Sequence, residues 1–342
     1  MGCFKLVEGF IYSNALCVYY SVLVLFGFLI DFLKNPFADP WAQKLRLEPP
    51  ACLTDPKYGT HKYMIFNNTK LHYVESGDPT KPLMIFLHGF PEFWFSWRYQ
   101  IEEFNKDFWC IAVDMKGYGD SEKPEEMEAY RMDVLVEDVR DIVRQLGREK
   151  CVLVGHDWGS LVGARYRDRH PDTLLALILL GGASFETWFQ ELWSNPEQLK
   201  KSWYVFLFRM PCVPERLLSA NDLQFLDSAM LVAGKEGVTR QHLECYKYWF
   251  GKPLALTAPL NYYRSNFSYR VSRKPRCSLA VPFLAALGAQ DRYLSAGLLR
   301  RLRSHYEHVQ TELLDRCGHF LQQEEPQRVN KLIRDFLNKH HI

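Results

Sequence analysis

The stretch GHDWGS at residues 155–160 decides the fold of this chain. It follows the apolar run CVLV at residues 151–154, and a helical pattern begins after it near Leu161. Small residues on both sides of one reactive position are typical of a nucleophile elbow, a strained turn between a buried strand and a helix. The pattern therefore predicts such an elbow, with Asp157 at its tip.

The reactive position of this turn holds an aspartate, whereas the common G-x-S-x-G form has a serine there. A carboxylate that attacks a saturated carbon forms an ester, and water can then attack the carbonyl carbon of that ester. A serine in the same role would leave an inert ether. Asp157 therefore indicates covalent chemistry at an alkyl carbon.

Strand-like runs and helical patterns alternate along most of the chain. Strands are predicted at residues 70–75, 83–87, 110–113, 151–154, 174–180, 281–287 and 310–314. The helical spacing of apolar residues is clearest at 133–146 and 326–337. This alternation predicts an α/β fold with a mostly parallel sheet and right-handed crossovers.

Residues 184–272 break the strand alternation, because this region is helical in pattern and rich in aromatic residues. We expect it to form a helical cap inserted into the sheet domain, over the carboxyl edge of the strands, where ligands bind. The expected core then comprises residues 61–183 and 273–342, and residues 31–60 form a linker.

The N-terminal residues 9–30 are mostly apolar and carry no charged side chain. A helix of this length, at about 1.5 Å per residue, crosses the roughly 30 Å hydrocarbon layer, so we expect a single-pass transmembrane anchor. The alternative is a cleaved signal peptide. Its apolar part usually has only about 7–15 residues and ends at an A-x-A-like site, which does not occur here before Pro36.

The orientation of this anchor is less well determined by the sequence. Lys34, Lys44 and Arg46 follow the apolar segment and one lysine precedes it, which favours a cytosolic catalytic domain, and we expect the endoplasmic reticulum membrane. Glycosylation sequons begin at Asn67 and Asn266, and they would matter only in a lumenal domain. The orientation stays open at this point.

Composition excludes several classes of function. The chain has 342 residues, enough for one large domain, and its formal net charge of +2 does not suggest a nucleic-acid partner. The nine cysteines show no C-x-x-C pair, so we expect reduced thiols and neither a disulfide framework nor structural zinc. No metal, no cofactor and no obligate protein partner is expected.

Three further motifs follow predicted strands, at the edge of the sheet where the elbow lies. HGFP comes after the second predicted strand, so the backbone N–H of Phe90 and that of Trp158 are expected to form an oxyanion hole. Asp291 and His319 follow the last two predicted strands. The chain order of nucleophile, acid and histidine is that of a hydrolase triad.

With these residues in place, the chain resembles the α/β-hydrolase-fold epoxide hydrolases, above all the membrane-anchored group of epoxide hydrolases 3 and 4. The resemblance covers nearly the whole chain. It rests on PACLTDP from residue 50, HGFPEFWFSWRYQ from 88, DMKGYGDSEKP from 114, GHDWGS from 155, NYYRSNF from 261 and GHF from 318.

The resemblance implies an α/β-hydrolase fold with an inserted helical cap, and it implies the role of each site residue. Asp157 is expected as the nucleophile, His319 as the base and Asp291 as its charge partner. Tyr204 and Tyr263 match the two cap tyrosines of the family, in a Y-x-x-x-F pattern and an aromatic-Tyr-Arg pattern respectively. Phe90, Trp158 and the two tyrosines are expected to line the substrate pocket.

Three residues depart from the family's usual pattern. Lys116 stands where arginine is usual, and Ser160 replaces a common glycine but is still small. Arg209 replaces a glutamine, which puts the substrate preference in question. It either helps to place a substrate carboxylate or lies on the solvated surface of the cap.

The resemblance implies an enzyme that converts lipophilic epoxides, such as epoxy fatty acids, to vicinal diols through an ester on Asp157, with water as the second substrate. One alternative is a haloalkane dehalogenase, which shares the HDWGS string but commonly has a second side-chain donor at the position of Phe90 and lacks the tyrosine pair. Another is a catalytically inactive, membrane-tethered binding protein of the same fold.

Overall fold

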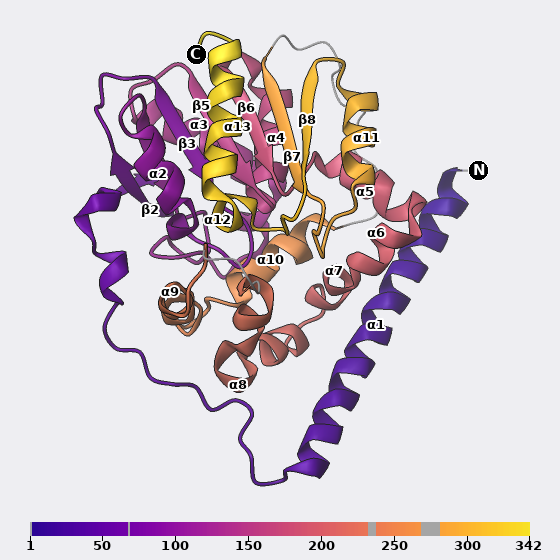
Figure 1. Cartoon of the computed structure of the whole chain (residues 1–342). Helices are drawn as coiled ribbons and strands as arrows, with labels where there is room; N and C mark the ends of the chain where they lie inside the picture. The colour runs from indigo at the N-terminus through magenta and orange to yellow at the C-terminus, as the bar shows by residue number, and fades with distance from the viewer. Residues whose placement is uncertain (1, 68, 232–236, 268–280) are drawn as a thin grey trace.

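An eight-stranded mixed sheet forms the centre of the protein (Figure 1). The computed structural model describes residues 2–67, 69–231, 237–267 and 281–342. The strands lie in the order β1-β2-β4-β3-β5-β6-β7-β8. Their bounds are β1 (Thr60–Phe66), β2 (Thr69–Ser76), β3 (Leu83–Leu87), β4 (Trp109–Val113), β5 (Cys151–His156), β6 (Leu174–Leu180), β7 (Phe283–Gly288) and β8 (Val309–Leu314).

The pairing of the strands confirms the predicted fold class. The six strands from β4 to β8 in the sheet order are parallel to their neighbours, and β1 and β2 add two antiparallel pairings at one edge. All seven predicted strands are present. The sequence reading missed β1, because most residues of this edge strand are exposed and its apolar signal is weak.

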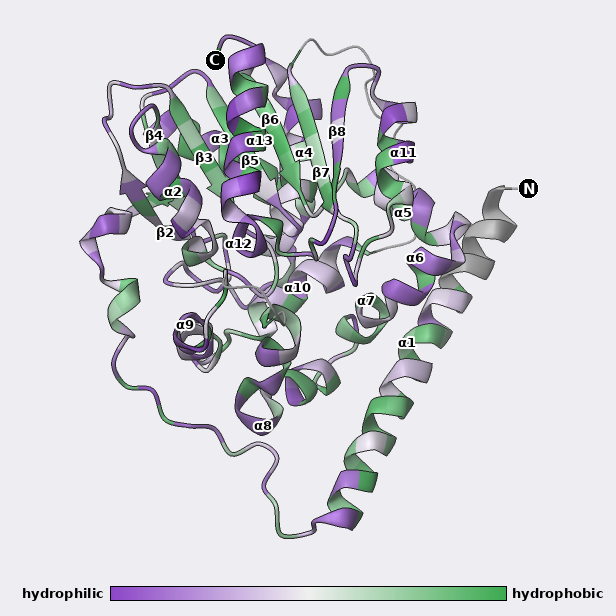
Figure 2. Ribbon diagram, in the orientation of Figure 1, coloured by the Kyte–Doolittle hydropathy of each residue, from purple (hydrophilic) through white to green (hydrophobic). Residues whose placement is uncertain are grey.

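Helices cover both faces of the sheet. Helices α2 and α13 pack on each other, as do α3 and α4. The helices of the sheet domain are α2 (Arg98–Phe104), α3 (Met132–Gln145), α4 (Trp158–Arg169), α11 (Gly297–His305), α12 (Leu321–Glu324) and α13 (Pro326–Lys339). Figure 2 shows apolar residues along the central strands, as the buried core between two helical layers requires.

A group of helices between β6 and β7 lies beyond the carboxyl ends of the strands (Figure 1). This cap contains α5 (Phe185–Ser194), α6 (Pro196–Lys201), α7 (Trp203–Phe208), α8 (Val213–Met230), α9 (Arg240–Phe250) and α10 (Thr257–Asn266). Non-helical backbone at residues 220–223 kinks α8. Short 3-10 turns connect other parts of the chain.

The first helix, α1 (Gly2–Lys34), runs along the outside of the cap (Figure 1). Its part Ile11–Lys34 is, among the described residues, the one helix that is long and apolar enough to cross a membrane. It contacts α7 and α8. The predicted anchor is therefore also part of the packed structure, which hydropathy alone did not indicate.

The structure corrects the expectation of reduced thiols for one pair of cysteines, while five other described cysteines are free. Cys52 lies in the expected linker, residues 31–60, and forms a disulfide with Cys245 on α9. The two residues are 193 positions apart, so no spacing motif could reveal the pair. The bridge ties the linker to the cap.

The two sequons differ in their surroundings. The Asn266 amide nitrogen donates to the backbone oxygens of Tyr130 and Tyr262, and its oxygen accepts the Met132 N–H. Both ends of this amide are hydrogen-bonded to the backbone, so Asn266 itself has a structural role. Asn67 is exposed, with its amide nitrogen donating to a surface aspartate.

Candidate active site

The elbow at Asp157 joins the end of β5 to the start of α4. Asp157 has φ 50° and ψ −112°, a conformation that costs a non-glycine residue about 1–3 kcal/mol. Gly159 is required beside it, because a Cβ there would overlap the backbone oxygen of Leu87 on β3. The small residues in the motif therefore let α4 approach the sheet and hold the carboxylate out at its edge.

One carboxylate oxygen of Asp157 accepts one of the two backbone N–H groups that are expected to form an oxyanion hole. The Phe90 N–H donates to Asp157 Oδ1 at 2.9 Å. Trp158 is the first residue of α4, where a backbone N–H has no acceptor inside the helix. Gly89 packs so closely on Asp157 that a Cβ would collide with its side chain. The loop after β3 is thus shaped around the Asp157 side chain.

The predicted base and its partner meet the nucleophile from the loops after β8 and β7. His319 Nε2 lies 3.5 Å from Asp157 Oδ2, and His319 Nδ1 lies 2.8 Å from Asp291 Oδ2. The other oxygen of Asp291 accepts the backbone N–H groups of Tyr293 and Leu294. Asp291 therefore fixes the orientation of the ring while its own position is fixed by the backbone.

The electrostatics of this group keep His319 charged. Burial lowers the pKa of His319, but the carboxylates of Asp291 and Asp157 outweigh burial and raise its pKa well above 6.5. For Asp291, burial raises the pKa, but His319 and the two backbone N–H donors outweigh this and hold it below 3.8. A positive ring between two carboxylates results.

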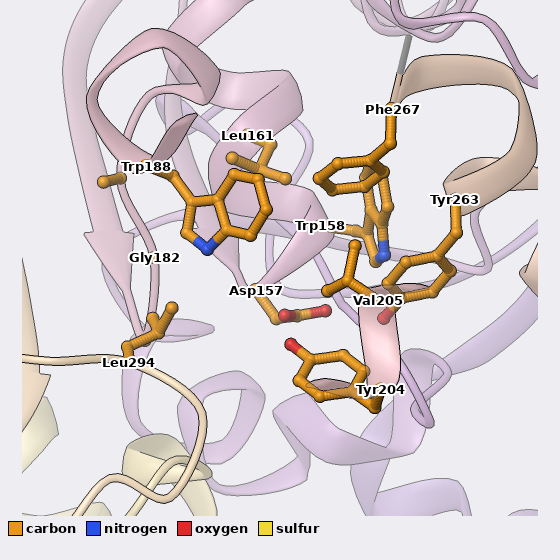
Figure 3. Close-up of a pocket in the computed structure, with 12 residues that line it drawn as sticks. Asp157, Trp158, Leu161, Gly182, Trp188, Tyr204, Val205, Tyr263, Phe267 and Leu294 are labelled. Carbon is orange, nitrogen blue, oxygen red and sulfur yellow. The ribbon is translucent and has the colours of Figure 1, made fainter. Parts of the chain in front are cut away.

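Tyr204 on α7 and Tyr263 on α10 come down from the cap toward Asp157 (Figure 3). Their ring centroids are 6.1 Å apart, and both line the same cavities as Asp157. Burial, together with the negative charge of Asp157, raises the pKa of each phenol well above 10. Both phenols stay protonated at neutral pH and are available as hydrogen-bond donors.

Two cavities meet at Asp157. A small one of about 30 Å³ is lined by Trp158, Leu161 and Trp188, and Figure 3 shows its walls. A large one of about 550 Å³ is lined by Phe90 and His319 and extends under the cap to Phe28 of α1. The four predicted pocket residues are thus divided: Phe90 borders the large cavity, Trp158 the small one, and the two tyrosines border both.

None of the three residues that depart from the family pattern lines either of the two cavities at Asp157. Lys116 forms a buried ion pair with Asp138 at 2.8 Å, and the Ser160 hydroxyl donates within the elbow to backbone oxygens. The Arg209 guanidinium donates to Ser13 on α1 and does not line the large cavity. Arg209 is therefore half-buried at the contact between the cap and the first helix.

The sequence reading missed a buried network below the site. Glu92 accepts hydrogen bonds from the Gly89 N–H, from His156 Nδ1 at 2.6 Å, and from the side-chain amides of Gln322 and Gln323. His156 Nε2 in turn contacts the backbone oxygen of His319 at 2.9 Å.

This network joins three segments: the loop after β3 that contains Gly89, the elbow at Asp157, and the loop that carries His319. Burial raises the pKa of Glu92, but the His156 ring and the Gly89 N–H outweigh burial and keep its pKa below 4.5. The ionised carboxylate can accept all four bonds. Both Glu92 and His156 lie within stretches quoted for the family resemblance, yet only the fold brings them into contact.

Fold and site together define an α/β-hydrolase with a carboxylate in the nucleophile position. A family model described as alpha/beta hydrolase fold matches residues 82–326. These residues contain the elbow, the oxyanion loop, the cap and His319.

Known proteins place the chain more narrowly. Epoxide hydrolase 3 of Xenopus tropicalis is 38% identical over 303 residues, which are 86% of this chain and 82% of that protein. Epoxide hydrolase 4 of Homo sapiens is 36% identical over 315 residues, which are 90% of this chain and 86% of that protein. A crystal structure of a Bacillus megaterium epoxide hydrolase in complex with an inhibitor is 32% identical in sequence and has a TM-score of 0.74. The match covers 81% of this chain and 100% of that chain. This chain belongs to the epoxide hydrolases of the α/β-hydrolase family.

Replacing Glu92 by glutamine should destabilise the protein strongly. The amide leaves His156 without its carboxylate partner in a buried site, so we expect a loss of about 3–5 kcal/mol in the free energy of unfolding. Glu103→Gln is the matched control, because Glu103 pairs with Arg334 at the surface and should change stability by less than about 1 kcal/mol. Denaturant unfolding measures both variants, and equal losses would contradict a structural role for Glu92.

Proposed function

We propose that this protein hydrolyses lipophilic epoxides to vicinal diols through a covalent ester on Asp157. The observation that carries this proposal is the position of the aspartate, which faces two protonated phenols across one cavity. A nucleophile on one side of the substrate and two acids on the other meet the needs of epoxide opening, because the ring oxygen is a poor leaving group. Epoxide hydrolase names among the relatives support it.

In the first step, Asp157 attacks an epoxide carbon and the carbon–oxygen bond of the ring breaks. The negative charge that develops on the ring oxygen is stabilised by the hydroxyls of Tyr204 and Tyr263, and one of them transfers its proton. The cap excludes water around both phenols, so their hydrogen bonds are strong. The product of this step is a glycol ester of Asp157.

In the second step, His319 removes a proton from a water molecule that attacks the carbonyl carbon of the ester. The carboxylate charge of Asp157 helps to raise the pKa of His319. Ester formation removes that charge, so the pKa of His319 falls and its ring gives up a proton. That proton restores the phenol that protonated the epoxide oxygen, and His319 is left as a neutral base. The N–H groups of Phe90 and Trp158 stabilise the oxyanion. When it collapses, the bond between the carbonyl carbon and the glycol oxygen breaks, and that oxygen takes the second proton of the attacking water. The diol is released, with Asp157 ionised and His319 protonated as at the start.

The alternatives lack a supporting feature. The Phe90 side chain carries no hydrogen-bond donor for a departing halide, whereas the phenols of Tyr204 and Tyr263 fit an epoxide oxygen. An inactive binding protein would not need His319 held between two carboxylates at 3.5 Å and 2.8 Å. Both alternatives remain outcomes of the experiments below.

The lining of the large cavity supports a lipophilic substrate class. Aromatic side chains such as Phe90, Phe208 and Phe225 line the space of about 550 Å³ beside Asp157. This lining suits a long apolar chain. We therefore propose epoxides of lipids, including epoxy fatty acids, in preference to small polar epoxides.

His319→Gln should form the ester and fail to hydrolyse it. The nucleophile and both phenols remain, but the base is lost, so we expect turnover to fall by about 10²–10⁴-fold. Intact-protein mass spectrometry after incubation with an epoxide should show one added substrate mass. Asp157→Asn in the same fold is the control and should show no adduct. An unmodified His319→Gln protein that still binds substrate would contradict the proposed step.

Tyr204→Phe and Tyr263→Phe should each slow ester formation, because each removes one donor to the ring oxygen. We expect a loss on the order of 10²-fold in single-turnover rate for each variant and a far larger loss for the double variant. Tyr293→Phe is the control, since Tyr293 lines the same cavity but packs against the His319 ring. Full activity of the double variant, or halide release from a haloalkane, would favour the dehalogenase alternative.

We propose further that α1 holds the protein in the endoplasmic reticulum membrane, with the catalytic domain toward the cytosol as the charge bias indicates. The Cys52–Cys245 disulfide is the observation against this orientation, because such bridges persist in oxidising compartments.

Protease treatment of sealed microsomes decides the orientation. A cytosolic domain should be digested without detergent and should carry no glycan at the exposed Asn67. Asn67→Gln provides the mass reference for the unglycosylated chain. Protection from protease together with a glycan-dependent mass shift would place the domain in the lumen.

A further inference from the structure

Small residues of helix α1 face the cap, and large apolar residues of the same helix are exposed on its outer side. Ser13, Cys17 and Ser21, spaced four residues apart, are 7%, 3% and 5% exposed and face the cap. Phe26 and Leu33 on other sides of the helix are 59% and 69% exposed. A helix on a water-soluble surface shows the opposite pattern, whereas small residues toward protein and large apolar residues outward suit a lipid environment.

This helix is docked on the cap rather than held away from it. The Tyr20 ring contacts Trp203 and Phe206 on α7, and Tyr12 contacts Trp193 on α5. Figure 1 shows α1 passing beside α6 and α7 and ending near α8. One side of α1 therefore lies directly on the cap, and its outer side is apolar.

The large cavity reaches this helix. Phe28 and Asp31, in the last turns of α1, line the same space as Asp157 and His319. Leu217 on α8 borders the cavity as well. One continuous space thus connects the nucleophile with a helix whose exposed face is apolar.

The end of the cavity near α1 also has polar groups. Asp31 lies on α1, and Asn221 and Gln224 lie on α8, which α1 contacts. Aromatic rings also line the cavity, among them Phe225, which stacks on Phe90. An amphiphilic substrate can therefore leave its polar end among these groups while its chain lies in the aromatic part.

We propose that lipophilic epoxides pass from the bilayer into the cavity between α1 and α8, past Phe28, so that α1 is a wall of the substrate channel as well as an anchor. This inference rests on the proposed function. It differs from simple tethering, which raises the substrate concentration near the enzyme but needs no contact between α1 and the substrate.

Bulk at Phe28 tests the route in the full-length protein in phospholipid vesicles. Phe28→Trp narrows the channel, so kcat/KM for the methyl ester of a long-chain epoxy fatty acid should fall roughly tenfold. Phe26→Trp, on the outward face of the same helix, is the matched control and should change it by less than about twofold. The kcat for saturating styrene oxide, a short epoxide, reports whether each variant is folded and chemically competent. Equal kcat/KM values of the two variants for the methyl ester would overturn the proposal.

Photolabelling separates this inference from the proposed function, since it does not depend on turnover. A long-chain fatty methyl ester with a diazirine should label Phe225, which lies inside the cavity, and the label should be reduced by Phe28→Trp and retained in Phe26→Trp. If no epoxide yields a diol but this pattern appears, the proposed reaction fails and the channel stands. If diols form but Phe225 is labelled equally in both variants, the channel fails and the reaction stands.

Discussion

The site depends on one backbone constraint, the strained turn that holds Asp157 at φ 50° between β5 and α4. The turn exists because Gly155 and Gly159 let α4 pack close to the sheet. It directs the carboxylate away from the core, onto the Phe90 N–H and toward His319. The surrounding sheet and helices supply the packing that offsets the strain.

Charge is arranged around this turn in two layers. His319 lies between Asp157 and Asp291, and the buried Glu92 and His156 lie behind that group and join the loops that carry it. The group of Asp157, His319 and Asp291 changes its charge during the proposed reaction, because ester formation neutralises Asp157. Glu92 and His156 take no part in the proposed reaction and can keep their hydrogen bonds throughout. The loops can therefore stay in place while the protonation states of the reacting groups change.

The cap and the first helix set what can reach these groups. Tyr204 and Tyr263 bring proton donors from the cap to a nucleophile that belongs to the sheet domain. Phe28 extends the lining of the same cavity to α1, whose outer face is apolar. In the proposed function, an epoxide that partitions into lipid would meet the enzyme on this side, so the proposed anchor and the proposed substrate class depend on the same helix.

The sequence by itself determined the strands from residue 70 onward, the elbow at Asp157, and the order of nucleophile, acid and histidine, because short-range periodicity and turn chemistry encode them. Only the tertiary structure decided which distant residues meet. The Cys52–Cys245 bridge, the pairing of Glu92 with His156 and the place of Phe28 in the cavity join segments far apart in the chain, with no spacing that marks them. Contacts of this kind depend on how the elements pack, which local sequence patterns do not specify.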